Sequence, residues 1–194
     1  MSTLKIKNQF REAINYIKET KSHIYGIIFL FLFSVLIGFV FSTELDNKFR
    51  PLIKEILSNT EDLNVIELVV FILQNNLQSA ILSIIIGMLA GIFPIINAIV
   101  NGALIGYVLA LTAKTVGFSS WWRLLPHGIF ELPAIIIALG LGTKFGFSIF
   151  AKAKNKKKEF IRRWYNSMNV ALLIIVPLLI IAAIIEGILI YLFS

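Results

Sequence analysis

The sequence predicts an all-α membrane protein: a polytopic membrane helix bundle of about five transmembrane helices, with the N-terminus inside and the C-terminus outside. Of the 194 residues, 58% are hydrophobic and the mean hydropathy is +0.86. A soluble domain usually has roughly 45–50% apolar residues, even with glycine counted. Several apolar runs are long enough to cross a bilayer, which takes about 20 residues. Basic and acidic segments alternate between these runs, and this alternation predicts the topology.

The apolar runs divide into five predicted spans. The run from Val65 to Thr112 is too long for one crossing, and Pro94 is the expected break because proline interrupts a helix. The spans are expected at residues 23–42, 66–92, 95–114, 124–150 and 168–193. Residues 23–194 thus form a single transmembrane domain, in which residues 65–76 either span or re-enter.

Charge predicts the orientation of the spans. Residues 1–22 hold five Lys or Arg and repeat apolar residues on one helical face, which predicts a basic amphipathic cytoplasmic segment. Residues 43–67 hold six acids against three bases, and residues 151–166 hold seven bases against one acid. Basic loops stay inside, so one or three crossings must lie between these two segments, and the length of residues 68–150 requires three. The net charge of +7 therefore indicates contact with anionic lipid, and no nucleic-acid partner is expected.

Small residues recur at every fourth position in three consecutive spans. Such stripes let helix backbones approach closely in lipid, where the hydrophobic effect gives little drive for association. They predict a tight bundle, and one of them could serve a homodimer. The stripes are Ser79, Ser83, Gly87 and Gly91; Ala98, Gly102, Gly106 and Ala110; and Ala134, Ala138, Gly142 and Gly146.

A few ionisable and amide residues interrupt the apolar spans. His127 and Glu131 lie one turn apart, so they share a helix face, and Glu186 lies in the last span. A charged group at such depth costs about 2.5–3.5 kcal/mol or more when unpaired, so these side chains should face the bundle interior. The predicted ligand or ion cluster consists of His127, Glu131, Glu186, Asn76 and Asn101.

Three interpretations of this cluster remain open. It is a hydrogen-bonded structural plug, a proton or ion pathway, or a metal site that needs further ligands from other helices or a second subunit. The chain has no cysteine and two histidines, without the HExxH spacing of a zinc protease. No catalytic residue, no resident metal and no cofactor is predicted.

Several of these residues fall in motifs that resemble a known family. LPHGIFELPA at residues 125–134, with NN at 75–76, GMLAG at 87–91 and NGALIG at 101–106, resembles the stage II sporulation protein M family. The resemblance covers roughly residues 70–150 and implies a multi-pass membrane protein of the kind found in bacteria and archaea. Carried over residue by residue, it points to Asn76, Asn101, Gly102, Pro126, His127, Gly128 and Glu131. It assigns a catalytic role to none of them.

The sporulation member of this family is a scaffold-like protein that works with a peptidoglycan hydrolase and another membrane protein. The resemblance therefore implies a non-enzymatic scaffold or partner-binding component of a membrane complex. The expected location is the cell membrane, and the expected partners are the lipid bilayer, a second copy in a homodimer, and other membrane proteins. The alternatives are an ion, proton or small-solute transporter or channel that uses the cluster, and a metal-binding membrane enzyme.

Overall fold

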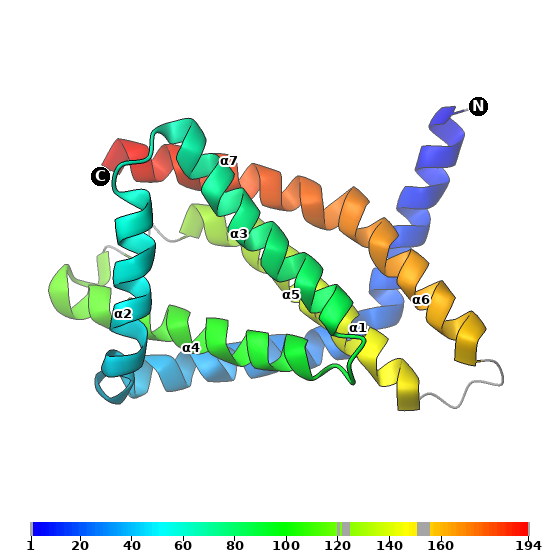
Figure 1. Ribbon diagram of the computed structural model, residues 1–194, viewed down its shortest axis with the longest axis horizontal. Coiled ribbons are helices and arrows are strands. Elements are labelled where there is room, and N and C mark those ends of the chain that lie inside the picture. Colours follow the sequence, from blue (N-terminus) through cyan, green and yellow to red (C-terminus); the bar gives the residue numbers. More distant parts are fainter. Residues whose placement is uncertain (1, 120, 122–124, 151–155, 194) are drawn as a thin grey trace.

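The computed structural model describes residues 2–119, 121, 125–150 and 156–193, and the side chains of residues 2–5, 125–127, 149–150 and 193 lie outside this description. Within these residues the secondary structure is helical, and five helices are long and apolar enough to cross a membrane. The prediction of an all-α membrane bundle with five spans is confirmed. The spanning helices extend between the two ends of the elongated molecule and cross one another obliquely (Figure 1).

Helix α1 (Ser2–Val40) joins the predicted cytoplasmic segment and the first span into one helix of 39 residues. The predicted cytoplasmic segment is therefore helical and continuous with the first span. It precedes the apolar run, predicted at residues 23–42, that forms this span. Figure 1 shows that the N-terminal part of α1 leans away from the rest of the helix. The Thr20 hydroxyl donates to the Tyr16 carbonyl at 2.7 Å, a bond that commonly bends helices.

Helix α2 (Ser42–Thr60) follows at once and lies across one end of the bundle (Figure 1). This end, where α1 stops and α2 lies, is called the α2 end. The opposite end, where α5 (Leu125–Gly146) stops and α6 (Lys156–Val170) begins, is called the basic end. The sequence predicts that the basic end is cytoplasmic and the α2 end is external.

Helices α3 (Val65–Ile86) and α4 (Ile92–Thr115) are joined by a short turn at the basic end. The break falls before Pro94, which sits in the first turn of α4 instead of separating the two helices. Ala90 and Gly91 adopt left-handed backbone angles, with φ of 58° and 71°. Glycine tolerates these angles without steric cost, so the GMLAG stretch stops α3 and reverses the chain. Helix α3 is continuous through residues 65–76, which favours a span over a re-entrant segment.

The last span is continuous with α6. The single-turn 3-10 helix η2 (Phe147–Phe150) ends the α5 segment, and α6 continues through a π-helical stretch, η3 (Ala171–Ile175), into α7 (Val176–Phe193). Pro177 lies directly after the π stretch and has no N–H to bond with the preceding turn. The wider π turn at this point is consistent with that missing bond.

The stripes of small residues lie at the contacts between helices. A side chain added at Gly106 would collide with the Val35 carbonyl of α1, and one added at Gly102 would place its Cβ 2.6 Å from the Phe31 carbonyl. In the same way, Gly142 of α5 faces the Ser83 carbonyl of α3. Backbones approach this closely only where a Cβ is missing, so the stripes set the arrangement of α1 against α4 and of α3 against α5.

Candidate functional site

Three polar residues meet in the interior, toward the α2 end. Glu131 lies six residues into α5, Asn76 in the middle of α3 and Glu186 seven residues before the end of α7. The Glu131 carboxyl lies beside the Asn76 amide and the Glu186 carboxyl. Two buried carboxyl groups at close range repel each other when both are ionised, so at most one of them is expected to carry a charge. The pair thus joins two helices at one polar contact.

One atom of this group stays unpaired. Glu186 Oε2 is buried and has no hydrogen-bond partner among the described residues. A buried acceptor without a partner is costly and is a point where a proton or another donor is expected to bind. Chemically, the group can brace three helices or hold and release a proton.

The other residues predicted for this cluster are placed differently. The backbone of His127 lies in α5 one turn before Glu131, and its side chain, like that of Pro126, lies outside the described residues. Asn101 is not brought to Glu131. Its amide donates to the backbone and side-chain oxygens of Asn97, the former at 3.0 Å.

Asn97 and Asn101 belong to a second polar network, between α3 and α4. The Asn97 amide donates to the hydroxyls of Ser79 and Ser83 at 3.1 and 3.0 Å. Asn101 lies one turn further along α4, on the same face, and so joins this network. The spacing of Asn97 and Asn101 predicted that they share a helix face, but it could not tell which neighbouring helix Asn101 would meet.

The two glycines of the family motifs differ in their surroundings. Gly102 lies against α1, where its missing side chain permits the close backbone contact. A Cβ at Gly128 would meet only the tip of Leu132, at 3.7 Å. Within the described residues, Gly102 thus has a clear packing role and Gly128 has none.

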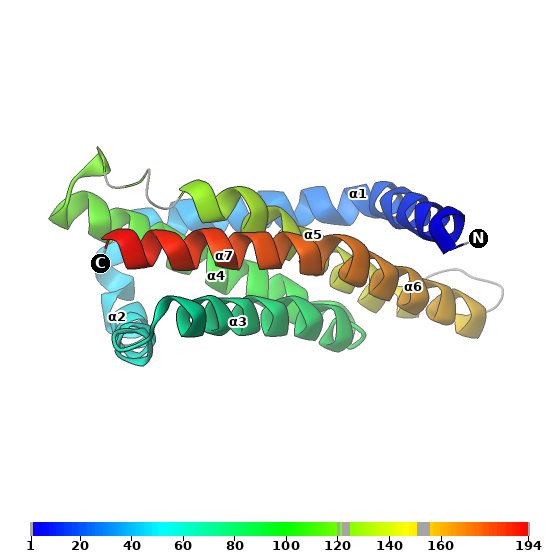
Figure 2. The same ribbon diagram turned by 90° about the horizontal axis from the view of Figure 1, so that it is seen from above.

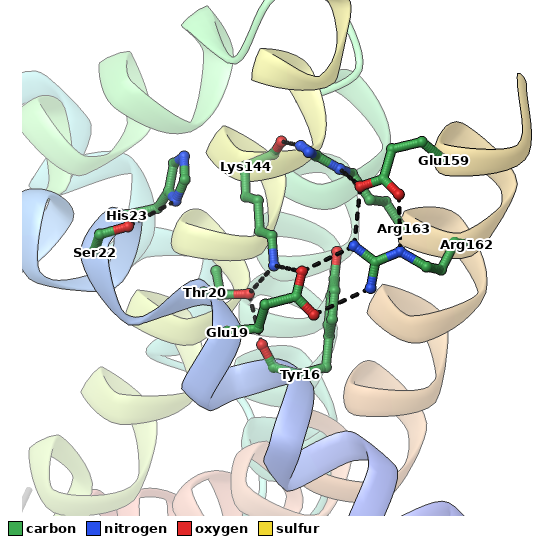
Figure 3. Close-up of polar contacts among 9 residues, drawn as sticks. All are labelled: Tyr16, Glu19, Thr20, Ser22, His23, Lys144, Glu159, Arg162 and Arg163. Carbon is green, nitrogen blue, oxygen red and sulfur yellow. Dashed lines mark hydrogen bonds and ion pairs between the residues drawn. The ribbon is translucent and has the colours of Figure 1, made fainter. Parts of the chain in front are cut away.

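A charged cluster at the basic end was not predicted. Lys144, near the end of α5, is only 4% exposed, and its ammonium lies 2.9 Å from the Glu19 carboxylate and 3.2 Å from the Thr20 hydroxyl (Figure 3). The same ammonium sits 4.1 Å from the centre of the Tyr16 ring, a cation–π distance. Lys144 is thus buried against α1 by an acid, a hydroxyl and an aromatic face.

Two arginines of α6 extend this cluster. Arg162 bridges Glu19 and Glu159, with closest contacts of 2.8 and 2.9 Å, and Arg163 donates to the Lys144 carbonyl at 2.5 Å. Hydrogen bonds from Arg162 and then from Lys144 hold the pKa of Glu19 at about 2, below its ordinary value of 4.5. The cluster joins α1 to α5 and α6, and Arg162 lies 143 positions after Glu19, so no local sequence pattern signals that meeting.

A third polar group lies at the α2 end. Asp46 of α2 accepts two hydrogen bonds from Arg50, both 2.8 Å, and one from the Tyr107 hydroxyl at 2.5 Å. Arg50, and then Tyr107, lower the pKa of Asp46. Lys114 donates to the Ser42 hydroxyl at 3.1 Å, and these side chains line an open cavity of about 270 Å³. The contacts fasten α2 to α4.

Metal ligands are not gathered in the part of the chain that is described. No group of three His, Asp or Glu side chains there lies close enough to hold an ion. The acid pair of Glu131 and Glu186 would need further ligands to bind a metal in the way that the third interpretation requires.

These features define a class of protein: a polytopic membrane protein whose spanning helices enclose a pair of neighbouring carboxyl groups. The model of the family called stage II sporulation protein M matches residues 27–189. The chain belongs to the stage II sporulation protein M family, and the resemblance found from the motifs is confirmed. No curated protein and no solved structure matches the chain.

Proposed function

We propose that the protein is a non-enzymatic scaffold of the cell membrane that holds partner proteins in a membrane complex. The observation that carries this proposal is the position of Glu131 beside both Asn76 and Glu186. Polar groups of α5, α3 and α7 thereby meet at one point. Because water is absent from the hydrocarbon region, such polar contacts favour one arrangement of the helices.

The packing around this connection supports a rigid role. Nearer the basic end, Gly142 and Gly146 of α5 lie against the backbone of α3 and of the turn between α3 and α4. A carrier must separate helices to open its binding site to each side in turn, whereas backbones that interlock resist separation. A scaffold benefits from this rigidity, because it presents a fixed surface to its partners.

A flux measurement in liposomes tests the proposal. The purified protein is reconstituted with an internal pH-sensitive dye, beside the variant Glu131→Gln, which keeps hydrogen-bonding capacity but cannot ionise. We expect proton and cation flux at the level of protein-free liposomes for both proteins. Flux in the wild type that Glu131→Gln abolishes would overturn the scaffold role.

The second candidate function is a proton or ion transporter or channel. The unpaired Oε2 atom of Glu186 favours it, because a buried carboxyl pair with a free acceptor is suited to take up and release a proton. This candidate predicts flux that depends on both carboxyl groups, so Glu186→Gln would abolish it as well. The same liposomes decide between the two functions.

A further inference from the structure

Helix α3 exposes polar side chains where a membrane-spanning helix is expected to show apolar ones. Gln74 and Gln78 lie one turn apart and are both exposed, in contrast to Asn76 between them, which is buried. Helix α3 has 22 residues. At 1.5 Å per residue, both glutamines lie within ~4 Å of its midpoint. They therefore face outward near the centre of the hydrocarbon layer.

Among the described residues, no hydrogen bond from the side chain of Gln74 or Gln78 is present, either to another helix or between the two amides. Acyl chains can neither donate nor accept a hydrogen bond, so amides that face lipid have donors and acceptors left open. A polar partner from a neighbouring chain would satisfy these groups.

The rest of the exposed face has the form of a helix-packing seam. Val70, Gln74, Gln78, Ile81 and Ile85 follow one another at intervals of three and four residues, and all are exposed. This spacing places them along one stripe of the helix, opposite the buried residues Leu68, Ile72, Asn76 and Ala80. Figure 2 shows α3 along one edge of the bundle and α1 along the opposite edge, so the stripe is open to a neighbour.

We infer that this stripe of α3 binds the same stripe of a second copy of the chain, with the two copies related by a two-fold axis along the membrane normal. Such an axis brings each glutamine to its own counterpart at the same depth. A primary amide is both donor and acceptor, so two identical amides satisfy each other. Amide pairs between spanning helices stabilise association in lipid. A dimer of this kind is compatible with either function discussed above and does not rest on the choice between them.

Crosslinking of single-cysteine variants tests the seam, since the chain contains no cysteine of its own. Val70→Cys and Ile81→Cys flank the glutamines and leave both amides in place. Leu36→Cys on α1 is the matched control, because Leu36 is 56% exposed and Val70 is 45% exposed. Both sites lie within ~8 Å of the α2-end terminus of their helices. In lipid nanodiscs or native membranes, oxidation is expected to crosslink the two α3 variants and to leave Leu36→Cys monomeric.

Removal of the amides tests whether the glutamines hold the two copies together or whether the two stripes only lie near each other. Gln74→Leu with Gln78→Leu in the Ile81→Cys background keeps an apolar face of similar size, which lipid solvates well and which leaves the fold intact. We expect dimerisation to weaken at least tenfold, read as the shift in crosslinked fraction with lipid dilution. Equal crosslinking at Leu36→Cys, an unchanged fraction after the leucine substitutions, or a purified wild-type protein that stays monomeric would each overturn the proposal. A wild-type protein that stays monomeric would also indicate that a different membrane protein is the partner of α3.

Discussion

Glu131 of α5 and Glu186 of α7 lie side by side inside the membrane-spanning bundle, although they are 55 positions apart in the sequence. Glu131 also lies beside Asn76, so an amide from a third helix joins the pair. Acidic groups survive in such surroundings when they are protonated or have polar neighbours, and these three residues supply such neighbours to one another. The relationship explains why two carboxyl groups are tolerated within apolar helices.

The first prediction concerns the stability that this connection provides. Glu131→Leu removes the carboxyl that lies beside Asn76 and Glu186 and leaves these two residues without their polar neighbour. We expect it to lower the free energy of unfolding by about 1–3 kcal/mol, the usual cost of unsatisfied buried polar groups. Glu131→Gln should cost less, because an amide can still bond with both neighbours. Thermal unfolding in detergent, followed by circular dichroism, measures the difference.

Ile129→Ala serves as the control for this series, because Ile129 lies in the same helix and is 63% exposed. It should change the melting temperature little. If Glu131→Leu were as stable as the wild type, the bracing role of the connection would be refuted.

The second prediction tests the close contact between α1 and α4. Gly106→Ala places a methyl group against the Val35 carbonyl, and backbone atoms cannot move aside as a flexible side chain can. Overpacking of this kind costs about 1–3 kcal/mol. Gly26→Ala is a matched control in α1, since an added Cβ there meets nothing within 4 Å. Melting curves of equal stability for the two variants would contradict the assigned packing.

The sequence predicted much of this architecture because membrane spans have strong local signals. Length and hydropathy located five spans, and four-residue spacing of small residues identified contact faces such as the one at Gly106. The turn between α3 and α4 was misplaced, because Pro94 is a stronger breaker by composition than the left-handed pair Ala90 and Gly91. Proline is accommodated in a first helical turn, and that is where it lies.

Sites made from distant segments were harder to predict. Glu131 and Glu186 could be grouped because depth in a membrane is readable from position in a span. Asn101 could not be assigned to a network, since that depends on which helix lies beside α4. Lys144 carried no local signal, and its burial against Glu19 follows from the bend and tilt of α1, which no sequence period encodes.

The third prediction concerns the buried cation of the basic end. Lys144→Met and Glu19→Gln should each destabilise the protein, and the double variant should lose less than the sum. We expect a coupling energy of about 1 kcal/mol, near the low end for contacting residues, because the Glu19 side chain is 45% exposed and is screened by water. A double-mutant cycle from unfolding curves measures the coupling. Strict additivity would show that the two residues do not stabilise one another.

The fourth prediction gives this coupling a pH dependence. The folded-state pKa of Glu19 is about 2, below the ordinary value of 4.5. A group with a lowered pKa stabilises the fold fully above its unfolded value and loses that contribution as pH falls through the folded value. The coupling should therefore be the same at pH values of about 8 and about 6, and should shrink as pH falls below about 4.5. A coupling that changed between the two higher values would be incompatible with the ion pair described.

The fifth prediction concerns the attachment of α2. Tyr107→Phe removes the hydroxyl that donates to Asp46 and keeps the ring beside Phe49, whose centroid lies 5.6 Å away. A hydrogen bond to a charged group stabilises the contact, although exposure of Asp46 to water weakens this effect. Amide hydrogen exchange in residues 42–60 should then become at least about fivefold faster, since local opening follows local stability. Exchange in α3 should stay unchanged, as should exchange in the control Tyr191→Phe, where the ring is 60% exposed. Unaltered exchange in α2 would mean that Arg50 and the apolar face of α2 hold it in place without Tyr107.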